Sequence, residues 1–181
     1  FYDPLLDAEN DIRQVLVRQE ANGGHAANGY ARISGKPAVC IATSGPGATN
    51  LITAIATAYA DSIPIVCITG QVNTDQIGSD VFQEADITGS AEPFVKHSYL
   101  LKDPEDTARV FKEAFYIAGT GRPGPVLIDI PMDVQKAVID FEYPEKCEIR
   151  SYKPTTKGNY VQVRRVMAAL EEAETVSYTH L

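Results

Sequence analysis

The sequence predicts an α/β fold in which an open, mostly parallel sheet carries helices on both faces. Three short apolar runs rich in Val and Ile begin at Ile12, Ala38 and Pro64, so that 26 residues separate each start from the next. The second and third runs are apolar throughout rather than alternating, which is typical of strands buried on both faces of a parallel sheet. Parallel strands also need a long crossover connection, and the stretches between the runs are long enough to supply helices.

The predicted elements follow one another along the first two thirds of the chain. The first three strands are residues 12–17, 38–43 and 64–70, and the helices after the first two are residues 20–33 and 48–59. Residues 94–101 form a weaker strand candidate, and residues 125–130 (PVLIDI) form a further buried strand. A helix over residues 104–118 lies between them, with Asp103 as its N-cap and Pro104 in its first position.

The chain changes character beyond Pro131. We predict one domain over residues 1–140, truncated at its N-terminus because the chain opens on Phe1, and a polar linker over residues 141–158. Residues 159–174 show a helical apolar stripe with nothing to cover it, so we interpret them as the first helix of a missing central domain. Residues 175–181 (TVSYTHL) fit neither that helix nor a following strand and are interpreted as a non-native tail.

Charge and composition exclude several classes of function. The 181 residues carry 16 Lys and Arg against 24 Asp and Glu, a net charge of −8, which leaves no basic stripe for a nucleic acid. No apolar run approaches the roughly 18 residues that a membrane span needs. The three cysteines form no disulfide framework, so we expect a cytoplasmic protein in which Cys40 and Cys67 are buried thiols within strands.

The sharpest motif is the turn of residues 43–50 (TSGPGATN), between a predicted strand and a predicted helix. In open α/β sheets, ligands bind outside the carboxyl ends of the strands, where glycine permits a close approach and a helix N-terminus offers N–H groups. A tight turn that needs glycine for its geometry alone explains the motif equally well. It is not a phosphate loop, because the GxxxxGK[ST] pattern is absent.

Other motifs point away from familiar sites. Residues 119–124 (GTGRPG) match GxGxxG, but they close a helix and open a strand, so we interpret them as a helix stop and turn and reject a Rossmann nucleotide site. The acidic residues Asp80, Glu84 and Asp86 fit a solvated loop better than a metal site. We therefore predict no metal ligands in this chain.

Glu20 follows the first predicted strand and opens a helix that is rich in glycine. A carboxylate at a helix N-terminus is explained by the helix macrodipole alone. A functional role is favoured by its place at a strand end equivalent to that of the turn at 44–50, and by the glycines, which weaken a helix unless something packs closely against it. The segment Phe82-Gln83-Glu84 also lies on a long polar loop after the third strand, where a site loop is expected.

Five long motifs stand in order within residues 1–140: VRQEANGGHAANGYAR, ATSGPGATNLITAIATAYADSIPIVCITGQV, DVFQEADI, KHSYLL and GRPGPVLIDIPMDVQ. Together they resemble the N-terminal pyrimidine-binding domain of thiamine diphosphate enzymes, and most closely that of acetolactate synthase (acetohydroxyacid synthase) large subunits. The resemblance implies the thiamine diphosphate-binding fold. It also implies that this chain is a fragment of a longer subunit with a central and a diphosphate-binding domain.

The resemblance assigns roles to five residues. Glu20 matches the glutamate that hydrogen-bonds N1′ of the aminopyrimidine and so activates the cofactor, a role that requires a carboxyl shielded from water, since desolvation raises its proton affinity. Pro46 and Asn50 match residues that contact the aminopyrimidine. Phe82 and Gln83 match residues that face the reacting centre, and Gln83 also contacts the cofactor.

The resemblance further implies a carboligase, which decarboxylates pyruvate and transfers the two-carbon unit to a second 2-keto acid in branched-chain amino acid biosynthesis. Mg²⁺ and the diphosphate are expected on the missing C-terminal domain, contributed by the other subunit, so that catalysis needs at least a homodimer. Many members also bind FAD, mainly through the central domain, and a separate regulatory subunit.

Three departures leave alternatives open. Met132 stands where many synthases have lysine, Asn73 where proline is common, and Val81 where alanine is frequent. Another thiamine diphosphate-dependent 2-keto acid decarboxylase or oxidase is therefore the second hypothesis. A hypothesis of another class is a catalytically silent binding or assembly module, because the isolated chain holds only half of such a site.

Overall fold

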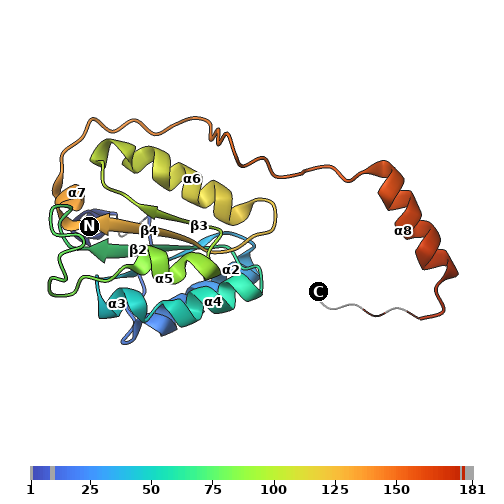
Figure 1. Ribbon diagram of the computed structural model, residues 1–181, viewed down its shortest axis with the longest axis horizontal. Coiled ribbons are helices and arrows are strands. Elements are labelled where there is room, and N and C mark those ends of the chain that lie inside the picture. Colours follow the sequence, from blue (N-terminus) through green and yellow to red (C-terminus); the bar gives the residue numbers. More distant parts are fainter. Residues whose placement is uncertain (1, 9–10, 176, 178–181) are drawn as a thin grey trace.

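The computed structural model describes residues 2–8, 11–175 and 177, and at its centre lies a sheet of four parallel strands (Figure 1). The strands are β1 (Ala38–Ala42), β2 (Ile65–Gln71), β3 (His97–Leu100) and β4 (Val126–Pro131), and their spatial order is β1-β2-β4-β3. The register places Cys40 opposite Cys67 and Val66 opposite Val126. The predicted open parallel sheet is confirmed.

Helices cover both faces of this sheet, as predicted. On one face lie α2 (Glu20–Ser34), α4 (Ile52–Ala60) and α5 (Ile87–Ala91), and on the other lies α6 (Thr107–Gly119), the yellow helix above the sheet in Figure 1. The shorter elements are α1 (Tyr2–Asp7), α3 (Pro46–Thr49), α7 (Met132–Lys136) and the 3₁₀ turns η1 (Glu92–Phe94) and η2 (Pro104–Asp106). The side of each crossover helix follows from the right-handedness of parallel connections: β1 to β2 runs in one direction across the sheet, and β3 to β4 runs back.

Successive residues of the central strands face opposite clusters of the core. In β2, Ile65 and Cys67 pack toward α4, whereas Val66 and Ile68 pack toward α6. Both faces are therefore dry, which explains why these strands are apolar throughout. Cys40 and Cys67 are buried free thiols with their sulfur atoms 3.3 Å apart, as the sequence predicted for small apolar side chains in strands.

The predicted strand at residues 12–17 is wrong: residues 13–17 form neither helix nor strand. The start of this segment is held by the N-terminal helix instead, because the Ile12 amide donates to the Ala8 carbonyl and the Gln14 side chain donates to the Leu5 carbonyl. Leu16 is 97% exposed, so no apolar face is buried that could offset the ordering of an edge strand.

The predicted helix at residues 48–59 is broken into α3 and α4. The Leu51 amide donates to the Ala48 carbonyl, three residues back rather than four, and this tighter turn separates the two helices. The helix at 104–118 is confirmed with its cap, since the Asp103 side chain accepts from the Glu105 amide before the 3₁₀ turn passes into α6. Residues 119–124 form the predicted stop between α6 and β4.

Residues 141–158, the predicted linker, contain no helix or strand, yet part of the segment is fastened to the domain. The Tyr152 hydroxyl donates to the Thr120 carbonyl at 2.8 Å and accepts from the Lys96 ammonium at 2.9 Å. The chain then leaves the domain and forms α8 (Tyr160–Glu172), which stands apart in Figure 1 and whose residues are all exposed. The domain limits stay a prediction, and of the predicted tail residues 176 and 178–181 lie outside the described residues.

Two of the three glycines of α2, Gly24 and Gly29, differ sharply in their surroundings. A Cβ added to Gly24 would lie 2.5 Å from the Cβ of Ala54 in α4, whereas a Cβ added to Gly29 would meet nothing within 4 Å. Gly24 therefore allows α2 and α4 to approach closely, which is the packing that the glycine-rich helix predicted.

These two positions form a matched pair for a stability test. Gly24→Ala is expected to lower the free energy of unfolding by about 1–3 kcal/mol, because the interior cannot accept the methyl group without a shift. Gly29→Ala is expected to raise it by about 0.5–1 kcal/mol, because alanine is the better helix former. Urea unfolding of the protein measures both. Equal effects of the two substitutions would contradict the close contact.

A carboxylate lies in the centre of the sheet. Asp129 of β4 is 1% exposed, and its two oxygen atoms accept hydrogen bonds from the Thr69 hydroxyl (2.7 Å) and the Gln71 amide (2.9 Å). Burial raises the pKa of Asp129 from the ordinary 3.8 to about 6, although the two hydrogen bonds act in the opposite direction. The carboxyl thus holds its proton to a higher pH in the folded than in the unfolded chain.

This pKa predicts the sign of a pH dependence. Because the folded pKa lies above the unfolded one, the contribution of Asp129 to the free energy of unfolding is greatest below pH 4 and is lost as the pH rises through 6. The wild-type free energy of unfolding should therefore fall by about 1 kcal/mol relative to Asp129→Asn between pH 5 and pH 7. Denaturant titrations of both proteins at the two pH values check this. A difference independent of pH would show that the carboxyl keeps its ordinary pKa.

Candidate functional site

The carboxyl ends of the four strands share one edge of the sheet, and the loops that follow β1 and β2 meet there. Residues 43–50 follow β1, and residues 72–86 follow β2. The first turn of α2 reaches the same edge. Crevices at this edge are where open α/β sheets bind ligands, so this is the candidate site.

Glu20 and Asn50 are brought together at this edge from elements 30 residues apart. The Asn50 side-chain amide donates to Oε2 of Glu20 at 3.0 Å. Glu20 is the first residue of α2, whose N-cap Gln19 accepts from the Asn22 amide with its side chain. The Asn50 hydrogen bond, followed by that of the Glu20 backbone amide, lowers the pKa of Glu20.

In this chain by itself, Glu20 is only half-buried and its hydrogen bonds favour the ionised form. The shielding from water that the resemblance implies stays a prediction for the complete site. The carboxyl of this chain is thus an acceptor at neutral pH.

The turn after β1 is shaped so that its backbone fits against Glu20. Pro46 is the first residue of α3. Its carbonyl accepts from the backbone amide of Asn50 (3.0 Å) and from the Thr49 hydroxyl (3.2 Å). A Cβ added to Gly47 would lie 3.4 Å from Oε1 of Glu20 and 2.7 Å from a methyl carbon of Thr43. Glycine therefore keeps the space beside this carboxylate oxygen free of a side chain.

The loop after β2 touches the same turn at Gly45. A Cβ on Gly45 would lie 2.8 Å from the carbonyl oxygen of Gln83, and Gly45 has a φ of 63° that other residues rarely adopt. Gln83 itself has a φ of 61°, a conformation that costs free energy in a residue other than glycine. Phe82 is 89% exposed beside it.

The side chain of Glu84 holds this loop in shape. Its carboxylate accepts from the backbone amides of Gly78 and Val81, and the Gly78 amide is the first cause of its lowered pKa. Hydrogen bonds to the Glu84 carboxylate thus shape the loop that carries Phe82 and Gln83, whereas Asp80 and Asp86 are exposed, as predicted for an acidic loop.

The structure therefore joins Glu20 to the Asn50 side chain, whose backbone amide is bonded to the Pro46 carbonyl, and it seats Gln83 against Gly45. Phe82 is at the same loop but makes no buried contact. The sequence analysis missed the uses of Gly45 and Gly47. The pattern GPG did signal close approach, but a single sequence does not show whether a ligand or another part of the chain is approached.

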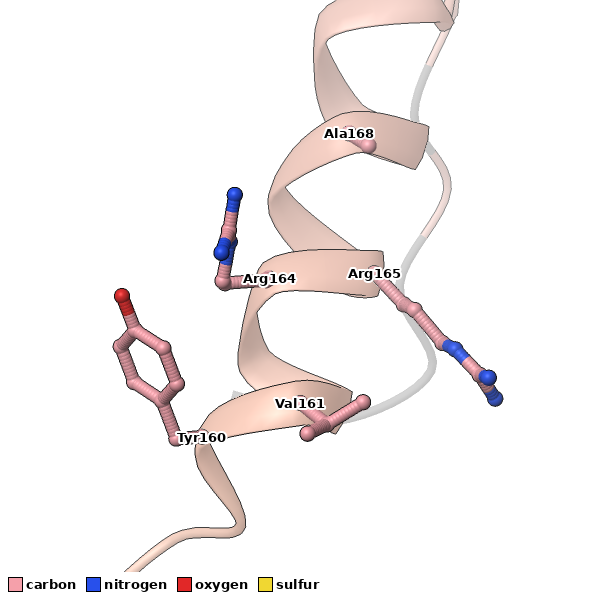
Figure 2. A pocket seen from close by; sticks show the side chains of 5 residues that line it. All are labelled: Tyr160, Val161, Arg164, Arg165 and Ala168. Atoms are coloured by element: carbon pink, nitrogen blue, oxygen red, sulfur yellow. The ribbon is translucent and has the colours of Figure 1, made fainter.

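The rest of the described chain adds no metal site, site pocket or membrane-spanning helix to this edge. Within residues 2–8, 11–175 and 177, no three His, Cys, Asp or Glu side chains lie close enough to hold a metal ion. A hollow lined by Tyr160, Val161, Arg164, Arg165 and Ala168 belongs to α8 alone: Figure 2 shows Tyr160 and Arg164 on one side of that helix and Arg165 on the other. None of the helices in the described part of the chain has the length and apolar character to cross a membrane.

Comparisons with known proteins agree on one family. Residues 1–90 match the family described as thiamine pyrophosphate enzyme, N-terminal TPP binding domain. The chain is 52% identical over 172 residues to acetolactate synthase of Mycobacterium bovis, and 50% identical over 173 residues to the acetolactate synthase large subunit of Corynebacterium glutamicum. It is 51% identical over 176 residues to acetolactate synthase of Arthrospira platensis. These matches cover 95% to 96% of this chain but only 28% to 30% of each relative.

The contact between Gly45 and Gln83 can be tested by a methyl group. Gly45→Ala is expected to displace the loop at residues 82–84, because the new Cβ would overlap the Gln83 backbone. Gly35→Ala is the matched control: it has a φ of 67°, so it suffers similar backbone strain, but nothing lies within 4 Å of its Cβ position and it lies outside this loop. Backbone hydrogen exchange at Glu84 measures the displacement. Equal acceleration in both variants would show that strain, not contact, acts at Gly45.

Proposed function

The chain belongs to the thiamine pyrophosphate enzymes, whose N-terminal TPP binding domain it carries, and on that premise we propose that it is the N-terminal part of an acetolactate synthase large subunit. The proposed reaction decarboxylates pyruvate and transfers the two-carbon unit to a second 2-keto acid. The observation that carries the proposal is the Glu20–Asn50 hydrogen bond of 3.0 Å beside Gly47, at the carboxyl edge of the sheet.

The residues at this edge fit the aminopyrimidine ring of thiamine diphosphate. The ring needs an acceptor for its N1′ hydrogen. One oxygen of Glu20 is bound by Asn50, and the other lies beside Gly47, which has no side chain. Because the Asn50 hydrogen bond lowers the pKa of Glu20, the carboxylate is ionised at neutral pH and is a strong acceptor. Asn50 and Pro46 lie where they could line the ring.

When bound, thiamine diphosphate supplies the electron sink that makes the loss of carbon dioxide from a 2-keto acid possible. The residues of this chain have simpler tasks. Glu20 accepts the N1′ hydrogen and holds the ring in its reactive tautomer, and Asn50 fixes the orientation of the carboxylate. Gln83 and Phe82, on the loop seated against Gly45, face the keto acids.

The site needs further protein to be complete. Phe82 on the site loop is 89% exposed, and Leu16 before the start of α2 is 97% exposed. A second subunit would cover such side chains and exclude water from Glu20. We therefore propose a homodimer or higher oligomer with the site at its interface. Mg²⁺ and the diphosphate would bind a further domain, and FAD and a regulatory subunit would bind other parts of the enzyme. The free thiols favour a cytoplasmic location.

A second reaction of the same cofactor is favoured by Met132. This residue begins α7, directly after β4, and is 44% exposed at the carboxyl edge where many synthases have a lysine. Loss of that positive charge would weaken the hold on a carboxylate substrate, so a different 2-keto acid decarboxylase or oxidase is the alternative. A catalytically silent role is proposed only for the isolated chain.

The proposal is tested by Glu20→Gln in the full-length enzyme, with acetolactate formation from pyruvate as the measurement. Glutamine keeps the shape of the side chain but loses the charge that accepts the N1′ hydrogen, so the rate should fall roughly 100-fold or more. Glu105→Gln is the control, because it removes an exposed carboxylate from the first turn of η2 and should leave the rate unchanged.

The outcomes separate the hypotheses. A wild-type rate in Glu20→Gln would show that Glu20 only complements the dipole of α2 and has no part in the reaction. Acetaldehyde without acetolactate from the wild type would favour the alternative reaction over the synthase. An inactive complete enzyme with cofactor and Mg²⁺ would contradict an enzymatic role.

A further inference from the structure

The buried carboxylate of Asp129 has no part in the reaction proposed above, although a buried charge is costly to keep. It lies on the face of the sheet that α2, α4 and α5 cover, beyond Leu127 on the same strand face. An ion removed from water costs several kcal/mol, and an apolar residue would fill the same place without that cost. The contacts of its neighbour Gln71 suggest what the carboxylate is for.

Gln71 is fixed at every polar atom of its amide. Its nitrogen donates both to Oδ2 of Asp129 (2.9 Å) and to the carbonyl oxygen of Ala85 (2.8 Å), and its oxygen accepts from the Val72 amide (2.9 Å). If the amide were turned over, its oxygen would face two other acceptors. Asp129 is thus one of three groups, with the Ala85 carbonyl and the Val72 amide, that hold the Gln71 amide in this orientation, and it is the charged one.

Ala85 connects this amide to the site loop. It is two residues beyond Gln83, whose backbone lies against Gly45, and its carbonyl also accepts from the Ile87 amide at 2.9 Å as α5 begins. The loop thus has two attachments: the Glu84 carboxylate shapes its first part, and Gln71 holds its end. These attachments offset the unfavourable backbone conformation of Gln83.

We propose that Asp129 is a positioning residue for the site: it orients the Gln71 amide, which holds the Ala85 carbonyl and thereby keeps Gln83 seated against Gly45. The inference deepens the proposed function, because the loop it positions is the one that would face the 2-keto acids. The chain of contacts itself can be tested without any turnover.

The test is Asp129→Asn in the full-length, cofactor-bound enzyme, read by backbone hydrogen exchange at Glu84 and Ile87. Asparagine replaces the charged acceptor of the Gln71 amide with a weaker neutral one, so the hold of Gln71 on the Ala85 carbonyl is loosened. Exchange at these two amides should accelerate about tenfold, the effect of one lost buried hydrogen bond, while the Gly124 amide in the turn before β4 should keep its rate. Thr69→Val is the control, because it also removes a hydrogen bond from Asp129 but leaves Gln71 and Ala85 joined.

A double variant separates positioning from simple core stability. In Asp129→Asn with Gln71→Glu, the pair at 71 and 129 regains a donor and an acceptor, but a carboxylate oxygen now faces the Ala85 carbonyl. We expect the unfolding midpoint to recover toward the wild type while exchange at Glu84 and Ile87 stays fast. Restored loop protection in the double variant, or equal acceleration in Thr69→Val, would overturn the inference.

These readouts are independent of the reaction. If the loop responds as expected but the enzyme makes no acetolactate, the positioning chain stands and the proposed function fails. If acetolactate forms and the loop does not respond to Asp129→Asn, the proposed function stands and the positioning chain fails.

Discussion

Parallel pairing of β1, β2 and β4 is the constraint on which the rest of the structure depends, because it brings every strand to its carboxyl end at one edge. The turn after β1 and the loop after β2 then have to share that edge. They fit only because Gly45 has no side chain where the backbone of Gln83 lies. The site is thus a consequence of topology first and of individual side chains second.

Much of the fold could be predicted from the sequence because its signals are local. Continuous apolar runs marked β1, β2 and β4, and Asp103 with Pro104 marked the helix that follows β3. The run at 12–17 was also rich in Val and Ile but formed no strand, because pairing and burial depend on neighbouring elements that the pattern of residues does not contain. The break between α3 and α4 likewise depends on one hydrogen bond, from the Leu51 amide to the carbonyl three residues back.

The candidate site was predictable in its members but not in its contacts. Glu20 and the turn at 44–50 were singled out by position and by resemblance, and they do meet, at 3.0 Å. The protonation preference of Glu20 was not predictable, since it depends on whether Asn50 or burial dominates. Asp129 is recognisable in the sequence as a single charged residue in an apolar strand. Its connection to the site loop is not, because it runs through Gln71 and Ala85, which are joined only in the three-dimensional structure.

The central claim is that the Glu20 carboxylate meets the aminopyrimidine ring of thiamine diphosphate. The most direct test is an experimental structure of the full-length protein with the cofactor, in which the distance from Glu20 to N1′ is measured. The account predicts a hydrogen bond of about 2.6–3.0 Å, with Asn50 still donating to the second carboxylate oxygen. A pyrimidine ring bound away from Glu20, or a carboxylate that still faces solvent in that complex, would contradict it.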